Sequence, residues 1–103
     1  MFFQEIGYEV LEASNGKQGI QVAVEEAPVL ILLDINMPEM MGYETLSYLK
    51  GNPKTAPIPV VMVTGQSELE SVERCLDAGA KDYIQKPFEL LQVKAKIERV
   101  LAG

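Results

Sequence analysis

The sequence contains no histidine and a single cysteine, and its basic residues are outnumbered by acidic ones, nine to fifteen. The lone Cys75 excludes a disulfide within the chain and a cysteine metal cluster, which is typical of the reducing cytoplasm. A net charge of −6 offers no basic surface to nucleic acid or anionic lipid. No apolar run approaches membrane-spanning length, and no signal peptide follows Met1. We therefore expect a cytoplasmic protein that binds neither nucleic acid nor a membrane.

What the chain does contain is enough apolar sequence to form a core. Apolar residues make up 48% of its 103 residues, and charged residues make up 23%. A chain of this length holds one domain, so residues 1–103 are expected to fold together.

Two uninterrupted apolar runs, at residues 29–33 and 60–63, predict strands that are buried on both faces, as in a parallel sheet. Helical patterns separate them, and strands that alternate with helices predict an α/β fold with helices on both faces of the sheet. The expected elements, in chain order, are a helix end at residues 2–6, a strand at 8–13, a helix at 17–27, a strand at 29–33, a helix at 43–50, a strand at 60–63, a helix at 68–77, a strand at 82–85 and a helix at 90–101.

The spacing of apolar residues also predicts which helix faces dock on the sheet. In the helix at 68–77 the inward residues are expected to be Leu69, Val72, Cys75 and Leu76. In the last helix the apolar stripe comprises Leu90, Leu91, Val93, Ile97, Val100 and Leu101.

Three of the predicted strands are followed directly by a residue with a charged or reactive side chain: Asp34, Thr64 and Lys86. Each has an ordinary explanation, as a turn residue, a helix cap or a surface charge. Because parallel strands deliver their carboxyl ends to one edge of the sheet, however, the three side chains should converge there. An acid, a hydroxyl and an ammonium together suit an aspartate that attacks phosphorus, since the phosphorylated carboxylate needs donors around its oxygens.

The same residues belong to motifs by which the chain resembles the receiver domain of two-component response regulators. The motifs are Asp34-Ile35-Asn36-Met37-Pro38 with Gly42, Val61-Met62-Val63-Thr64-Gly65, Ala78-Gly79-Ala80 and Lys86-Pro87-Phe88. Together they are far more specific than any one alone. The resemblance implies a flavodoxin-like parallel sheet; in the receiver family the first strand, to which no segment of this sequence corresponds, lies between the family's second and third strands.

The resemblance also implies roles for individual residues in a phosphoprotein that is not itself an enzyme. Asp34 looks like the phosphoacceptor, supplied by a histidine kinase or another signalling protein, and it would bind Mg²⁺ together with the backbone carbonyl of Asn36. Thr64 and Lys86 match the residues that contact the phosphoryl group. Tyr83 matches an aromatic whose rotamer follows Thr64 and which couples the site to a surface formed by the last strand and the two last helices. From the residues alone, Tyr83 is better explained as a half-buried strand aromatic than as a switch.

The start of the sequence departs from the receiver pattern. Receivers open with a strand that ends in adjacent acidic residues, which hold Mg²⁺ with the phosphoacceptor. The present sequence starts near the end of what would be the first helix of a receiver. Its early acidic residues, Glu5, Glu9 and Glu12, do not match those acids. Because one charge pair at 4 Å contributes about 1 to 4 kcal/mol in water or at intermediate dielectric, losing two carboxylates should weaken Mg²⁺ binding roughly a thousandfold or more.

We therefore expect an atypical, N-terminally truncated receiver with impaired phosphorylation, acting by protein interaction and dimerisation. The alternatives are a functional phosphoacceptor receiver, an incompletely recorded ordinary receiver, and an aspartate-nucleophile phosphatase. The phosphatase is disfavoured because residues 34–36 lack a second acid. Without the first strand, either residues 8–13 shift to pair with residues 29–33, or two protomers join; we favour a homodimer.

Overall fold

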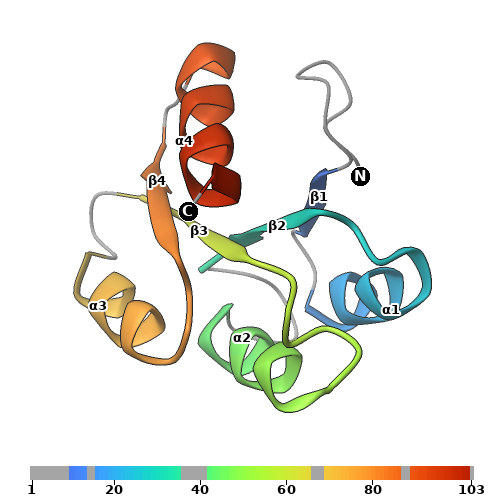
Figure 1. Cartoon of the computed structure of the whole chain (residues 1–103). Helices are drawn as coiled ribbons and strands as arrows, with labels where there is room; N and C mark the ends of the chain where they lie inside the picture. The colour runs from blue at the N-terminus through green and yellow to red at the C-terminus, as the bar shows by residue number, and fades with distance from the viewer. Residues whose placement is uncertain (1–9, 14–15, 36–41, 66–68, 87–88, 103) are drawn as a thin grey trace.

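The computed structural model describes residues 10–13, 16–35, 42–65, 69–86 and 89–102, along which strands and helices alternate (Figure 1). The strands are β1 (Val10–Ala13), β2 (Leu30–Asp34), β3 (Val60–Thr64) and β4 (Asp82–Gln85). The helices are α1 (Gly16–Glu26), α2 (Gly42–Gly51), α3 (Leu69–Asp77) and α4 (Leu90–Ala102). The predicted order is thus confirmed for this part of the chain. The helix end expected at residues 2–6 lies outside the described residues.

The strands form one parallel sheet in the order β1-β2-β3-β4. The four apolar residues of β2 and all five residues of β3 are buried, as their uninterrupted apolar runs predict for central strands. β1 pairs directly with β2, with Val10 opposite Leu30 and Leu11 opposite Ile31. Of the two arrangements considered for residues 8–13, the structure therefore shows the one in which they pair with β2 within a single chain.

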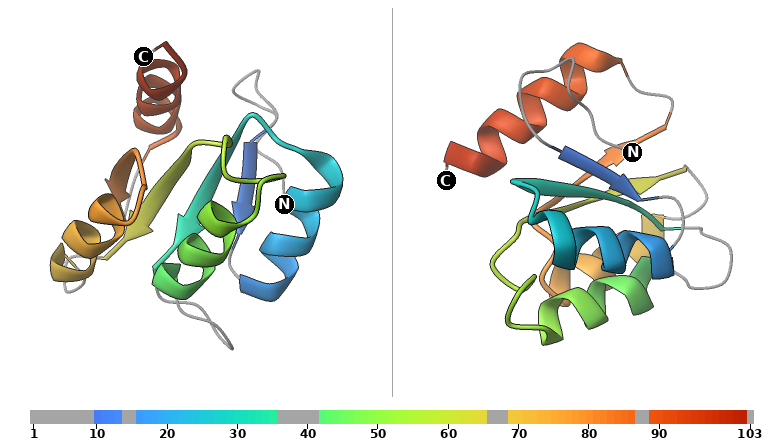
Figure 2. Two further views of the ribbon diagram at one scale, coloured as in Figure 1. Left: turned by 60° about the horizontal axis from the view of Figure 1, so that its bottom comes forward. Right: turned by 90° about the vertical axis from the view of Figure 1, so that its right-hand side faces the viewer.

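Helices cover both faces of the sheet, as predicted: α1, α2 and α3 lie on one face and α4 on the other (Figure 2). Because successive side chains of a strand point to opposite faces, alternate residues of the same strands enter two separate cores. Leu33 and Met62 belong to the core beneath α1–α3, whereas Leu32 and Val63 belong to the core beneath α4. In the part of the chain that the structure describes, no helix is both long and apolar enough to cross a membrane.

Three leucines predicted to face the sheet are exposed instead. Leu76 on α3 is 37% exposed, and Leu91 and Leu101 on α4 are 76% and 38% exposed. The predicted apolar stripe of each helix was wider than the face that contacts the sheet. α4 docks through Val93 and Ile97, one turn apart and fully buried, and the two leucines project away from that narrow line of contact.

Candidate functional site

The carboxyl ends of β2, β3 and β4 bring Asp34 and Lys86 together. Asp34 is the last residue of β2, and Lys86 directly follows β4. The Lys86 Nζ donates a hydrogen bond to Asp34 Oδ2 at 2.6 Å. The Lys86 backbone N–H donates to the Thr64 carbonyl at 2.7 Å, so the lysine is fixed to the end of β3 as well.

The Asp34–Lys86 ion pair is accessible to solvent. The side chain of Lys86 is 50% exposed and that of Asp34 is 20% exposed. An exposed pair of this kind contributes little to stability, about 0 to 1 kcal/mol, because water and salt screen it. Its geometry is instead that of an ammonium held beside an accessible carboxylate oxygen, where it can neutralise further negative charge.

Thr64 ends β3 at the same edge, and its hydroxyl is bonded to the backbone of the next residue. The side chain is fully buried, and Oγ1 donates to the Gly65 carbonyl at 2.9 Å. A hydroxyl has one proton, so it would have to leave the Gly65 carbonyl to donate to an anion at Asp34. The structure therefore joins two of the three predicted side chains and places the third nearby with a different partner.

Gly42, the first residue of α2, lies against the end of β2. Its N–H donates to the Ile35 carbonyl at 2.8 Å. A Cβ at this position would lie 2.6 Å from both the Asp34 carbonyl oxygen and the Ile35 Cα, closer than any side chain can approach a backbone. A glycine is therefore required where α2 begins beside the candidate site. Asn36, predicted to supply a metal-ligating carbonyl, lies outside the described residues.

A second polar cluster links β4 to α4 and was missed by the sequence analysis. Lys96 Nζ donates to Asp82 Oδ1 at 2.9 Å and lies 5.1 Å from the centre of the Tyr83 ring. The Tyr83 N–H donates to the same Asp82 oxygen at 2.7 Å. Nothing in the local sequence pairs these residues, because their contact depends on how α4 crosses β4.

The pKa of Asp82 reflects this cluster. Burial acts to raise the pKa, but the hydrogen bonds from Lys96 and Tyr83, together with the charges of Lys96 and Arg99, hold it below the usual 3.8. The carboxylate is therefore the favoured form, and it anchors Lys96 above the tyrosine ring.

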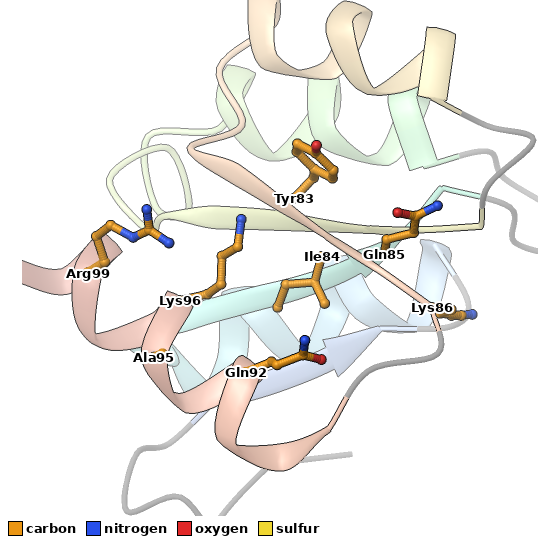
Figure 3. Close-up of a pocket in the computed structure, with 8 residues that line it drawn as sticks. All are labelled: Tyr83, Ile84, Gln85, Lys86, Gln92, Ala95, Lys96 and Arg99. Atoms are coloured by element: carbon orange, nitrogen blue, oxygen red, sulfur yellow. The ribbon is translucent and has the colours of Figure 1, made fainter.

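A groove of about 640 Å³ lies between β4 and α4, beside this cluster (Figure 3). It is lined by Tyr83, Ile84, Gln85, Lys86, Gln92, Ala95, Lys96 and Arg99. Three of these residues are basic and none is acidic, in a chain whose net charge is −6. Figure 3 shows Lys86 at one end of the groove, with its side chain directed away from Lys96 and Arg99. Lys86 thus belongs to both the ion pair and the groove.

The described residues supply one ligand that a magnesium site at the strand ends could use. Asp34 supplies a carboxylate at the strand ends, and no group of three or more histidine, cysteine, aspartate or glutamate side chains in the described ranges is placed to hold a metal ion. Mg²⁺ in proteins takes oxygen ligands in near-octahedral geometry, often retains several waters and is usually bound through one or two carboxylates, and Asp34 is a carboxylate that could serve in this way.

Comparisons with known proteins agree with this architecture. The sequence model of the response regulator receiver domain matches residues 1–98. The chain is 42% identical to a histidine kinase of Formosa agariphila over 91% of its own length, and 41% identical to the phosphate regulon transcriptional regulatory protein PhoB of Pseudomonas aeruginosa over 92%. It spans only 7% and 42% of the lengths of these two relatives.

Solved structures give the same result. A putative response regulator from Chloroflexus aurantiacus superimposes with a TM-score of 0.85 at 29% identity, covering 97% of this chain and 82% of that one. The receiver domain of the sensor histidine kinase PA1611 from Pseudomonas aeruginosa, whose structure has magnesium in its active-site cleft, gives 0.82 at 25% identity with the same coverage. On these matches and its flavodoxin-like parallel sheet, the chain belongs to the response regulator receiver domain family.

Proposed function

We propose that this receiver domain of a two-component system accepts a phosphoryl group on Asp34 and passes the signal on through protein contacts. The observation that carries the proposal is the 2.6 Å contact between Lys86 Nζ and Asp34 Oδ2 at the carboxyl ends of the strands. A histidine kinase or another signalling protein would be the donor. In support, one relative is named a histidine kinase, and another match is the receiver of a sensor histidine kinase.

The chemistry follows from the two side chains. An Asp34 carboxylate oxygen attacks the phosphorus of a phosphohistidine, an O–P bond forms, and the P–N bond breaks. The electron pair of that bond returns to the imidazole nitrogen. The Lys86 ammonium, already beside Oδ2, then also pairs with the oxygens of the transferred group.

The signal would leave the site through Thr64 and the groove between β4 and α4. The Thr64 hydroxyl, now on the Gly65 carbonyl, could turn to a phosphoryl oxygen. Lys86 would transmit its own rearrangement directly, because it also lines the groove with Tyr83. We accordingly assign the groove to partner recognition. We also propose that the protein is cytoplasmic.

A second candidate is an atypical receiver that works mainly through protein interaction and is phosphorylated slowly. It rests on the expectation that Mg²⁺ is held weakly at the strand ends, where the described residues bring the Asp34 carboxylate. The accompanying homodimer was predicted from an unpaired strand edge, but the direct pairing of β1 with β2 shields one side of β2 within a single chain. The dimer therefore stays a prediction, and light scattering that shows a monomer at high micromolar concentration would contradict it.

Phosphorylation with acetyl phosphate and Mg²⁺, followed by intact-mass measurement, separates the two candidates. If Asp34 is the phosphoacceptor, a stoichiometric and hydroxylamine-sensitive adduct should form in the unmodified protein and disappear in Asp34→Asn. Asp77→Asn is the matched control, because Asp77 is an exposed carboxylate on α3. An adduct no greater than that of Asp34→Asn would refute the first candidate and support the second.

A further inference from the structure

The groove between β4 and α4 is basic, although the chain as a whole is acidic. Its lining includes Lys86, Lys96 and Arg99 and no carboxylate, in a chain whose net charge is −6. Lys96 and Arg99 both project from α4, whereas Lys86 lies at one end of the groove with its side chain directed away from them (Figure 3). Positive charge that is gathered in a groove favours an occupant with negative charge.

Arg99 is the base that is available to such an occupant. Its side chain is exposed, and among the described residues it has neither an ion pair nor a hydrogen bond. Lys96 lies 2.9 Å from Asp82 Oδ1, but an ammonium has three N–H donors and this contact uses one of them. Because Lys96 and Arg99 are three residues apart on α4, they are neighbours on one face of the helix. One carboxylate of a partner can therefore bind the guanidinium bidentately and also approach the ammonium.

The open shape of the groove suits a peptide segment better than a small molecule. Small-molecule sites enclose most of the surface of their ligand. In this groove most of the lining residues are themselves exposed, namely Gln85, Lys86, Gln92, Ala95 and Arg99. The helical wall from Gln92 to Arg99 is about 10 Å long, which is the span of roughly three residues of an extended chain.

The other side chains of the groove also suit a peptide. The amides of Gln85 and Gln92 can each donate to and accept from a peptide backbone. Leu91 is 76% exposed and lies one turn before Ala95 on α4, so it offers an apolar contact beside the groove. The walls thus combine a cationic end, backbone-binding amides and an apolar rim.

A second copy of this chain is a poor occupant. A two-fold contact through the groove would place the basic residues of one copy against the same residues of the other. Like charges that face each other across an interface oppose association. The charges therefore favour a different molecule.

We propose that the groove binds an acidic peptide segment of the signalling partner. An aspartate or glutamate of that segment pairs with Arg99 and Lys96, and an apolar neighbour of the acid packs on Leu91. The proposal rests on the partner recognition assigned above to the groove and adds the chemistry of the partner. The cations that it uses are present in the unphosphorylated protein, so it is testable without phosphoryl transfer to Asp34.

Selection from a library of random short peptides tests the chemistry. The bait is the purified protein without a phosphoryl donor. The recovered peptides should be enriched in aspartate and glutamate, with an aliphatic or aromatic residue beside the acid. Recovery of peptides without acidic enrichment, or of none, would overturn the proposal. This outcome is distinct from a failure of the proposed phosphorylation, which is measured as the missing adduct on Asp34.

A variant at Arg99 then tests the location. The most strongly recovered peptide is labelled, and its affinity is measured by fluorescence anisotropy. Arg99→Gln should weaken binding about tenfold or more, because a charge-assisted hydrogen bond to a carboxylate is lost. Lys94→Gln is the matched control, since it removes an exposed charge of α4 that does not line the groove. Circular dichroism verifies that both variants are folded.

The remaining results also decide the proposal. Amide replacement of the acidic residues of the peptide should weaken binding to the parent protein, and should have little further effect on Arg99→Gln, since both changes remove the same contact. Equal weakening by Arg99→Gln and Lys94→Gln would indicate general charge attraction and overturn the proposal. A dimer of the parent protein in light scattering that Arg99→Gln dissociates would assign the groove to a second copy and would also overturn it.

Discussion

The ammonium of Lys86 lies 2.6 Å from Asp34 Oδ2, although 52 positions separate the two residues in the chain. The parallel registers of β2, β3 and β4 create this contact, since they place Asp34 opposite Val63 and Thr64 opposite Gln85. The pairing of the strands therefore forms the site. Its chemistry can be altered at Lys86 without disturbing the core.

Replacing Lys86 should affect phosphorylation far more than folding. Lys86→Met removes an exposed ion pair, so we expect the free energy of unfolding in urea to change by no more than about 1 kcal/mol. The yield of phosphoryl adduct with acetyl phosphate should nevertheless fall, because the transferred group loses the ammonium that lies beside Asp34. Lys94→Met, at an exposed position on α4, is the control and should retain the parent yield. A normal yield in Lys86→Met would show that the contact has no part in phosphoryl transfer.

A methyl group at Gly42 should destabilise the fold at the site itself. The Cβ of Gly42→Ala would meet the Asp34 carbonyl oxygen and the Ile35 Cα at 2.6 Å, both of them backbone atoms that cannot simply turn aside. Overpacking of this kind costs about 1 to 3 kcal/mol, measurable by urea denaturation. Gly51→Ala is the matched control, because nothing lies within 4 Å of its Cβ and alanine favours the helix. Equal stabilities of the two variants would disprove the close approach.

Replacing Lys50 should also lower stability, because this residue in the last turn of α2 donates two hydrogen bonds to the connection that leads into β3. Lys50→Met keeps an apolar chain over Gly79 but leaves the Ala56 and Ile58 carbonyls without this donor. Because these hydrogen bonds are only partly buried, the loss of the donor should cost at most about 1 to 3 kcal/mol, and the urea midpoint should fall. Lys54→Met, at an exposed position of the same connection, should change it little. If both variants unfold at the parent midpoint, the two hydrogen bonds contribute nothing to stability.

The sequence was sufficient to predict the elements and the edge where the site lies, because the buried strands and the residues that end them are local patterns. Asp34 at the end of β2 and Thr64 at the end of β3 are examples. Contacts that depend on the direction of a single side chain or on the way a helix crosses the sheet were not predictable. Whether the Thr64 hydroxyl turns to Gly65 or to Asp34 depends on loop geometry, and the pairing of Asp82 with Lys96 depends on how α4 crosses the sheet.

The exposed leucines illustrate the same limit. Helical spacing identifies the apolar residues of α4, but how many of them touch the sheet depends on the curvature of the two surfaces. Val93 and Ile97 do so, whereas Leu91 is largely exposed. For β1, the sequence pattern predicted the strand itself but did not decide which strand it would pair with.

Cys75 should report on unfolding. It is fully buried in α3, and burial raises the pKa of its thiol, although the charge of Arg74 acts in the opposite direction. Because only the thiolate reacts with a disulfide reagent such as Ellman's reagent, the native protein should react much more slowly than the same protein in urea. A native rate equal to that of the unfolded chain would contradict the burial of α3 against the sheet.

The Asp82–Lys96 pair should make stability depend on pH in the acid range. The hydrogen bonds and charges around Asp82 outweigh its burial and hold its pKa in the folded protein below the usual 3.8. The folded state therefore binds this proton less tightly than the unfolded chain does, so the contribution is present above the usual value and is lost as the pH falls through the folded pKa. Near neutrality Asp82→Asn should cost about 1 kcal/mol or less, as expected for a partly exposed pair, and the cost should vanish in strong acid. Urea denaturation across this pH range measures the difference, with Asp77→Asn, at an exposed position on α3, as the control. A cost for Asp82→Asn that stays constant from neutral to strongly acidic pH would mean that the carboxylate charge is not what holds Lys96 and α4 against β4.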